Sequence, residues 1–187
     1  MKRHLFLTGP MGCGKSTTID RAVGAKLPNF GGFLTKRVLG SDGHAQSFYL
    51  ESPDCMKRET FLDFSSGKPE VYLEVFQNLG ASLLDGDVLI LDEIGGIELL
   101  CPEFTAALDG VLASDVPILG VMKGEAPADA LIRALGLTEE YEIAVQNLRK
   151  ALREDENTLL YECGQFDEQA LRLAQAWVKE YADASLF

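Results

Sequence analysis

A glycine-rich segment near the amino terminus carries the clearest chemistry of the sequence. Residues 9–16 read Gly-Pro-Met-Gly-Cys-Gly-Lys-Ser and match the pattern G-x-x-x-x-G-K-S/T in full. Glycines let consecutive backbone N–H groups turn inward around an anion without Cβ clashes, and a helix that begins here directs its positive dipole end to the same point. A tight strand-to-helix turn would explain the glycines but not the Lys-Ser pair. The segment therefore predicts a site for nucleotide phosphates.

Each residue of this loop has an expected role. Lys15 is expected to place its cation on the β and γ phosphates and so to be catalytic, and the Ser16 hydroxyl is expected to coordinate Mg²⁺. Thr17 is expected to hold the α phosphate. The predicted nucleotide-binding residues are Gly9, Pro10, Met11, Gly12, Cys13, Gly14, Lys15, Ser16 and Thr17.

Two carboxylates follow an apolar run later in the chain. Residues 87–92 read Asp-Val-Leu-Ile-Leu-Asp, and Glu93 comes next. An acid at the end of a strand beside a phosphate loop binds magnesium, usually through water, so Asp92 is predicted to be a metal ligand together with Ser16. Glu93 points differently and is predicted to orient or deprotonate an attacking water. Acidic strand-end residues that merely face solvent are the simpler alternative for both.

The acidic pair favours hydrolysis of a nucleoside triphosphate, and two other reactions stay open. A small-molecule or nucleoside kinase needs no activated water and relies on a lid with several arginines. Arg149 and Arg153 share a helical face and could form such a lid, but the acidic residues 154–156 beside them favour surface salt bridges. A slow nucleotide-dependent switch or accessory protein would take an arginine from a protein partner in trans.

Strand-length apolar runs alternate with helix-length amphipathic stretches, and these elements must position the residues above. Such alternation predicts an α/β fold with a mostly parallel central sheet between two helical layers, the three-layer αβα architecture of P-loop NTPases. Strands are expected over 4–8, 32–39, 46–51, 87–92, 116–122 and 158–163, and helices over 15–25, 70–84, 102–113, 126–135, 139–153 and 167–181.

The region 31–66 interrupts the alternation. Two strand-like segments there flank residues 40–43, which read Gly-Ser-Asp-Gly and are typical of a turn. They predict an antiparallel hairpin inserted over the nucleotide site. The chain of 187 residues contains no repeat or long linker, so a single P-loop domain over 1–187 is expected.

Composition excludes several classes of function. Lys and Arg total 17 against 29 Asp and Glu, a formal charge of −12, and the basic residues form no cluster larger than a pair. Binding to nucleic acid is therefore not expected. No apolar stretch is long enough to span a membrane, and the four cysteines lack metal-ligand spacing. We expect a cytoplasmic protein with reduced thiols whose substrate is a nucleoside triphosphate.

Three segments together resemble the cancer-related nucleoside-triphosphatase family, the thermophilic-type P-loop NTPases. They are the phosphate loop, Gly-Gly-Phe-Leu-Thr over residues 31–35, and Asp-Glu-Ile-Gly over 92–95 with Glu98 and Leu99. The resemblance implies a single-domain enzyme that hydrolyses the β–γ phosphoanhydride of ATP, GTP and other nucleoside triphosphates with Mg²⁺ and a broad base preference.

This chain departs from the family pattern where positive charges are usual. Gly96 and Ile97 stand where lysine and methionine are common, and residues 165–167 read Gln-Phe-Asp where the family tends to show Asn-Arg-Asp. Leu39 and His44 occupy a hairpin that usually carries arginines. Phosphate binding is unaffected by these differences, whereas rate and nucleotide preference depend on them.

Four further residues have two interpretations each. Phe33, Phe48 and Tyr49 could stack on a nucleotide base, but packing in the core of the hairpin explains them better. Glu98 is expected to support the acidic site or the start of a helix, and contact with substrate is the less favoured interpretation.

Overall fold

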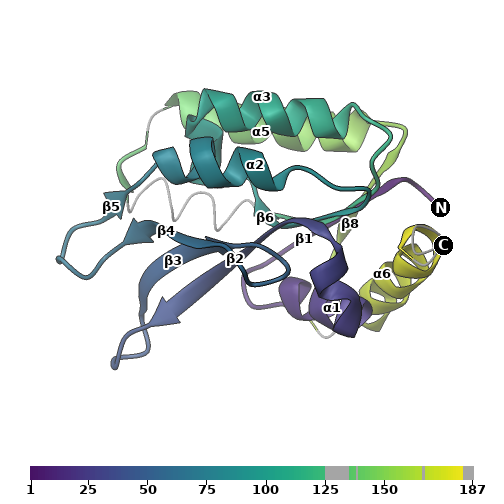
Figure 1. Cartoon of the computed structure of the whole chain (residues 1–187), viewed down its shortest axis with the longest axis horizontal. Coiled ribbons are helices and arrows are strands. Elements are labelled where there is room, and N and C mark those ends of the chain that lie inside the picture. Colours follow the sequence, from purple (N-terminus) through teal and green to yellow (C-terminus); the bar gives the residue numbers. More distant parts are fainter. Residues whose placement is uncertain (125–134, 138, 166, 183–187) are drawn as a thin grey trace.

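The computed structural model describes residues 1–124, 135–137, 139–165 and 167–182. One sheet lies between two helical layers, with α1 and α6 on one face and α2, α3 and α5 on the other (Figure 1). The expected three-layer α/β architecture is therefore confirmed. The strands are β1 (His4–Thr8), β2 (Gly31–Leu39), β3 (Ala45–Glu51), β4 (Arg58–Asp63), β5 (Glu70–Val71), β6 (Leu89–Ile94), β7 (Ile118–Met122) and β8 (Thr158–Glu162). The α-helices are α1 (Lys15–Val23), α2 (Ala81–Leu83), α3 (Pro102–Leu112), α5 (Glu139–Glu154) and α6 (Glu168–Tyr181).

The sheet has the strand order β5-β4-β3-β2-β6-β7-β1-β8. The five strands from β2 to β8 in this order pair in parallel, as the alternation of strands and helices predicts. Every residue of β1 and of β7 is buried, because helices cover both faces of a parallel sheet. Their continuous apolar runs follow from that burial.

The inserted region is an antiparallel extension of the same sheet. β2 pairs with β3 across the expected turn, and β4 and β5 then add two more antiparallel strands. The sequence does not predict β4, since its first three residues, Arg58 to Thr60, are exposed and only Phe61 and Leu62 are buried. Such a strand lacks the regular alternation that marks one.

The prediction of a helix that begins at residue 70 is wrong. Glu70 and Val71 form β5, where Val71 pairs with Leu62. The helical segment comes later, as a π-helix η2 (Phe76–Gly80) that leads into α2. Pairing with β4, the preceding strand, has overridden the helical pattern of these first residues.

The other helices lie close to their expected places. α1 ends two residues early and continues as a 3-10 helix η1 (Gly24–Asn29). α6 follows Asp167, whose carboxylate accepts a hydrogen bond from Ala170 N at 3.0 Å and so caps the helix. The expected helix over 126–135 lies outside the described residues except for its last position.

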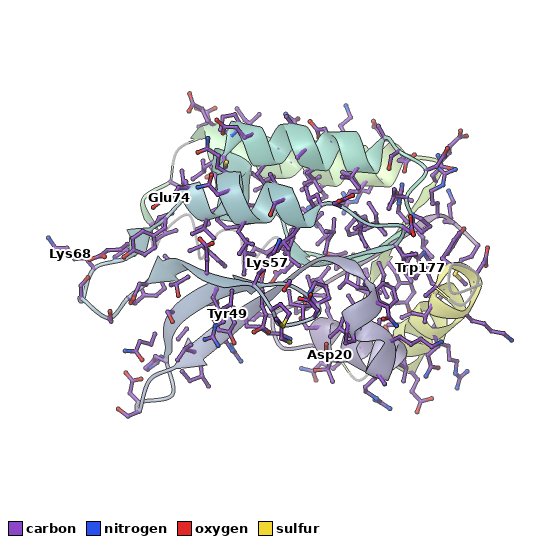
Figure 2. The ribbon with its side chains drawn as sticks, viewed as in Figure 1. Asp20, Tyr49, Lys57, Lys68, Glu74 and Trp177 are labelled. Atoms are coloured by element: carbon purple, nitrogen blue, oxygen red, sulfur yellow. The ribbon has the colours of Figure 1, made fainter. Side chains whose placement is uncertain are left out.

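Each face of the sheet has its own hydrophobic core. One cluster packs α2, α3 and α5 against the sheet around Phe33, Phe104 and Tyr141. The other packs α1 and α6 around Ile19 and Trp177, and Trp177 lies on the inner side of α6 in Figure 2. These cores hold both ends of the phosphate-loop helix and the end of β6 against one rigid sheet. None of the helices described is long and apolar enough to cross a bilayer.

Candidate nucleotide site and catalytic residues

The parallel strands are connected by helices on opposite faces of the sheet. The chain leaves β1 into α1 on one face and leaves β6 into α3 on the other face, where α5, the helix before β8, also lies (Figure 1). Ligands of open α/β sheets bind at the carboxyl ends of the strands where the connections change face, and here these are the ends of β1, β7 and β6. The predicted phosphate loop and both predicted acids lie at this edge.

Glycine geometry shapes the phosphate loop. Gly9 has φ of +132°, and a Cβ there would lie 2.6 Å from the carbonyl oxygen of Cys163. Gly14 has φ of +100° at the N-cap of α1. Both positions therefore require glycine, the first also because the loop passes so close to the chain that follows β8.

Lys15 is buried and its ammonium lies across the loop. Nζ donates to the carbonyl oxygens of Gly9 at 2.9 Å and Pro10 at 2.8 Å, and lies 3.8 Å from Cys13 Sγ. A lysine ammonium carries three donors. These contacts use them to hold the cation over the loop that precedes α1. This is the position in which a cation can meet a phosphate bound by the loop.

The remaining loop residues divide into a buried part and an exposed rim. Cys13 is buried beside Lys15. The rim residues are exposed and present their backbone and side chains to solvent: Pro10, Met11, Gly12, Ser16 and Thr17.

Ser16 and Asp92 meet across 76 residues of sequence. Ser16 Oγ donates to Asp92 Oδ1 at 2.9 Å. Asp92 is 2% exposed, and burial raises its pKa to about 7, with the nearby charge of Glu93 adding to the shift, while the Ser16 hydrogen bond and Lys36 oppose it. A cation held beside this carboxylate would favour its ionised form.

These two groups fit magnesium. A hydroxyl and a carboxylate are the hard oxygen ligands that Mg²⁺ prefers, and the ion usually takes one or two protein ligands and completes its shell with waters and substrate phosphates. Over the described part of the chain no cluster of three or more His, Cys, Asp or Glu side chains forms an all-protein metal site. The donor set therefore suits a metal that arrives with a nucleotide.

Glu93 lies beside Asp92 but in a different setting. β6 has a register shift in its pairing with β7 between Asp92 and Ile94. The Glu93 N–H donates to Thr35 Oγ1 at 3.2 Å. Its carboxylate pairs with Lys123 at 3.6 Å, and both side chains are about a quarter exposed, 27% and 22%. The Glu93 carboxylate is thus accessible at this edge of the sheet, while Asp92 is enclosed.

Glu98 supports the loop that follows β6. Its Oε1 accepts hydrogen bonds from Gly95 N at 2.6 Å and Gly96 N at 2.8 Å. The carboxylate is 4% exposed, and burial raises its pKa. Tyr141 of α5 donates its hydroxyl to Gly95 O at 3.3 Å. Glu98 therefore has the supporting role that the sequence favours, at the start of the 3-10 helix η3 (Ile97–Leu100).

Arg149 corrects one interpretation of the sequence. The acidic residues after it favour an exposed salt bridge, but the side chain is 7% exposed and donates to Lys123 O at 2.6 Å. Arg153, by contrast, is exposed. The two do not form a lid pair, since α5 packs Arg149 into the protein.

Sequence reasoning missed Lys123 and Tyr141, gave Arg149 a different role and noted Thr35 only as part of the segment 31–35. Lys123, Tyr141 and Arg149 come together because β7 pairs with β6 and α5 packs against η3, the segment that follows β6. The one local signal is that Lys123 directly follows the apolar run of β7, at the same sheet edge as the carboxyl end of β6.

Two of the three aromatic residues, Phe33 and Phe48, pack in the core as expected, and Tyr49 does not. Phe33 stacks in the core with Phe104 at 5.8 Å between ring centroids, and Phe48 packs against the same cluster. Tyr49 instead carries the Arg58 guanidinium 3.5 Å above its ring.

Comparison with known proteins agrees with this geometry. A family model described as NTPase matches residues 4–154. The chain is 29% identical over 172 residues to nucleoside-triphosphatase THEP1 of Methanocaldococcus jannaschii, covering 84% of this chain and 97% of that protein. It is 31% identical over 137 residues to the bovine cancer-related nucleoside-triphosphatase homolog, covering 60% of this chain and 70% of that one. The crystal structure of THEP1 from Aquifex aeolicus matches with a TM-score of 0.54 at 19% identity over 78% of this chain and 96% of that chain, and supports the fold.

The family model spans the phosphate loop, the acidic pair and Lys123, which are the parts that the fold brings to one edge of the sheet. Since that match extends well beyond half of the chain, the protein belongs to the NTPase family of THEP1 and cancer-related nucleoside-triphosphatases.

Proposed function

We propose that this nucleoside-triphosphatase hydrolyses the β–γ phosphoanhydride of ATP- and GTP-type nucleotides in a Mg²⁺-dependent reaction. The observation that carries the proposal is the 2.9 Å contact between Ser16 Oγ and Asp92 Oδ1. It joins a phosphate loop to an acidic strand end through the two ligand types that magnesium takes in such sites. When bound, the ion would neutralise charge on the β and γ phosphates.

The residues of the chain would then have separate roles in binding the phosphates and in activating water. The loop N–H groups and Lys15 bind the phosphates and stabilise the charge that develops on the transferring phosphoryl group. Glu93 holds the attacking water and takes its proton. The water oxygen forms a bond to the γ phosphorus, the bond from that phosphorus to the bridging oxygen breaks, and a nucleoside diphosphate and phosphate leave.

A broad base preference is part of the proposal. The chain after β8 borders the loop, because β8 lies beside β1. Asp167 in that segment already accepts hydrogen bonds from Gly164 N at 3.1 Å and Ala170 N at 3.0 Å, and from the Tyr161 hydroxyl at 3.2 Å. A carboxylate engaged in this way is poorly placed to select one base, which supports acceptance of several.

The test is phosphate release from each of ATP, GTP, CTP and UTP, with Mg²⁺ and with excess EDTA. We expect stoichiometric release from at least ATP and GTP without any acceptor, and its loss in EDTA. Release that requires an added nucleoside or metabolite would instead identify a kinase. Release that is very slow alone and rises with a protein partner would identify a switch.

A further inference from the structure

Lys123 stands at the centre of the sheet edge that forms the site. It directly follows β7, which lies between β1, the strand that leads into the phosphate loop, and β6, the strand that ends in the acidic pair. Its N–H donates to Ile94 O at 2.8 Å, so its backbone is joined to the end of β6. The Arg149 guanidinium holds its carbonyl oxygen at 2.6 Å. The main chain of Lys123 is therefore fixed from both sides.

The Lys123 ammonium faces two carboxylates. Nζ lies 3.6 Å from Glu93 Oε1. A Cβ added to Gly96 would lie 2.7 Å from Glu98 Oε2 and 3.5 Å from Lys123 Nζ, so the buried Glu98 carboxylate and the ammonium flank the same glycine. Burial of Glu98 needs a nearby cation as well as its two N–H donors, and Lys123 is that cation. The Lys123 side chain is nevertheless 22% exposed.

We infer that Lys123 is a catalytic residue that supplies, from within the chain, the positive charge that many P-loop enzymes take from an arginine finger. The inference rests on the proposed function. If Glu93 holds the attacking water, that water lies about 3 Å from the carboxylate and roughly 3–3.5 Å from the γ phosphorus. An ammonium beside Glu93 is then close enough for the flexible lysine side chain to bring it to the γ-phosphate oxygens. Lys123 pairs with Glu93 in the free protein and contacts the phosphoryl group during transfer.

The other cations of the site are less well placed for this role. Lys15 is committed to the loop, with two carbonyl oxygens bound. Arg149 is buried and binds a backbone oxygen. Lys36 acts on the charge of Asp92, the enclosed acid. Within the described ranges, the ion pair with Glu93 that the structure records is that of Lys123.

The test compares Lys123→Met and Lys123→Arg with the wild type. We expect Lys123→Met to lower kcat about 100-fold or more, as loss of one donor to a transition-state charge does, while the Kd for ADP changes less than about threefold. Trapping of ADP with aluminium fluoride and Mg²⁺, a mimic of the transferring phosphoryl group, should be lost. Lys123→Arg should recover part of both the kcat and the trapping, because the charge is restored. Lys150→Met is the matched control, since Lys150 is an exposed lysine of α5.

Loss of Lys123 leaves Glu98 without its cation and could unfold the protein, so the same comparison is made in a Glu98→Gln background. Glutamine can still accept from the two glycine N–H groups but carries no buried charge. The drop in kcat from Glu98→Gln to Glu98→Gln/Lys123→Met should be as large as in the wild-type background. Wild-type kcat and trapping in a folded Lys123→Met protein would overturn the inference and leave the proposed function intact. A wild type that releases no phosphate would overturn the proposed function itself.

Discussion

At the scale of single residues, burial separates the two neighbouring acids of β6. Asp92 is enclosed and bonded to Ser16, while Glu93 is partly exposed and paired with Lys123. A carboxylate that binds a metal should be held in place, and one that takes a proton from water should be accessible. The two settings therefore suit the different roles that we propose for Asp92 and Glu93.

Glu93→Gln tests the role of the accessible acid. Glutamine keeps the shape but cannot take a proton from water, so kcat should fall about 100- to 10,000-fold with little change in ATP affinity. Phosphate release and binding of a fluorescent ATP analogue measure the two quantities. Glu142→Gln, an exposed change on α5, is the control. Wild-type turnover by Glu93→Gln would remove this residue from the mechanism.

Lys15→Ala tests the loop cation. Its loss removes the ammonium that we propose binds the phosphates, together with its two hydrogen bonds to carbonyl oxygens of the loop. We expect ATP binding or turnover to be lost, by at least tenfold in Kd or kcat. Lys26→Ala, a change at the distal end of the same helical segment, serves as the control. If Lys15→Ala binds and hydrolyses ATP as the wild type does, the loop does not act as proposed.

At the scale of elements, α5 supports the loops that follow β6 and β7. Tyr141 donates to Gly95 O from a fully buried position, and Arg149, two turns further along, donates to Lys123 O. Burial and the charges of Glu98 and Glu93 raise the pKa of the Tyr141 hydroxyl, which keeps it a donor. The helix therefore supports the two segments that follow β6 and β7.

Tyr141→Phe tests this support. The change removes one buried hydrogen bond and should lower the free energy of unfolding by about 1 kcal/mol, with a fall of a few-fold in kcat as the Gly95 loop loses a restraint. Thermal unfolding and phosphate release measure the two effects. The matched control is Tyr181→Phe, whose hydroxyl donates to Met1 O at an exposed site. An unchanged kcat would show that the Tyr141 hydrogen bond contributes to the stability of the fold and not to turnover.

At the scale of the whole molecule, the two ends of the sheet serve different purposes. The carboxyl ends of the parallel strands carry the site, while the amino end of β1 carries His4, which is fully buried. Among the residues that the structure describes, neither of its ring nitrogens makes a hydrogen bond of ordinary geometry. Burial lowers the pKa of His4, although the Asp155 carboxylate opposes the shift.

This histidine makes stability depend on pH. The unfolded chain protonates His4 near its ordinary pKa of about 6.5, whereas the folded protein resists protonation until a lower pH. Between the folded pKa and pH 6.5 the unfolded state therefore binds more protons than the folded state. The free energy of unfolding has its full value above pH 6.5 and decreases as the pH falls from there through the folded pKa. His4→Gln should reduce the decline in urea unfolding between pH 7.5 and 5, and His44→Gln, an exposed change, should not. Equal slopes in all three proteins would contradict the assignment.

Local patterns determined much of this protein. The phosphate loop, the strand over His4–Thr8 and the apolar strand before Asp92 could be predicted because each depends on neighbours in sequence, on glycine φ angles and on runs of buried side chains. The resemblance to the family rests on the phosphate loop, the acidic strand end and the segment 31–35. The roles that we propose for Asp92 and Glu93 also rest on their place at the end of a strand.

The tertiary structure alone decided which side chains meet. The contact of Ser16 with Asp92, the pairing of Glu93 with Lys123 and the burial of Arg149 all depend on the strand order, in which β7 lies between β1 and β6. Strand order is a property of long-range pairing, and a local pattern in one strand does not encode its neighbours. For the same reason the phosphate loop was visible in the sequence, and the lysine that we place opposite it was not.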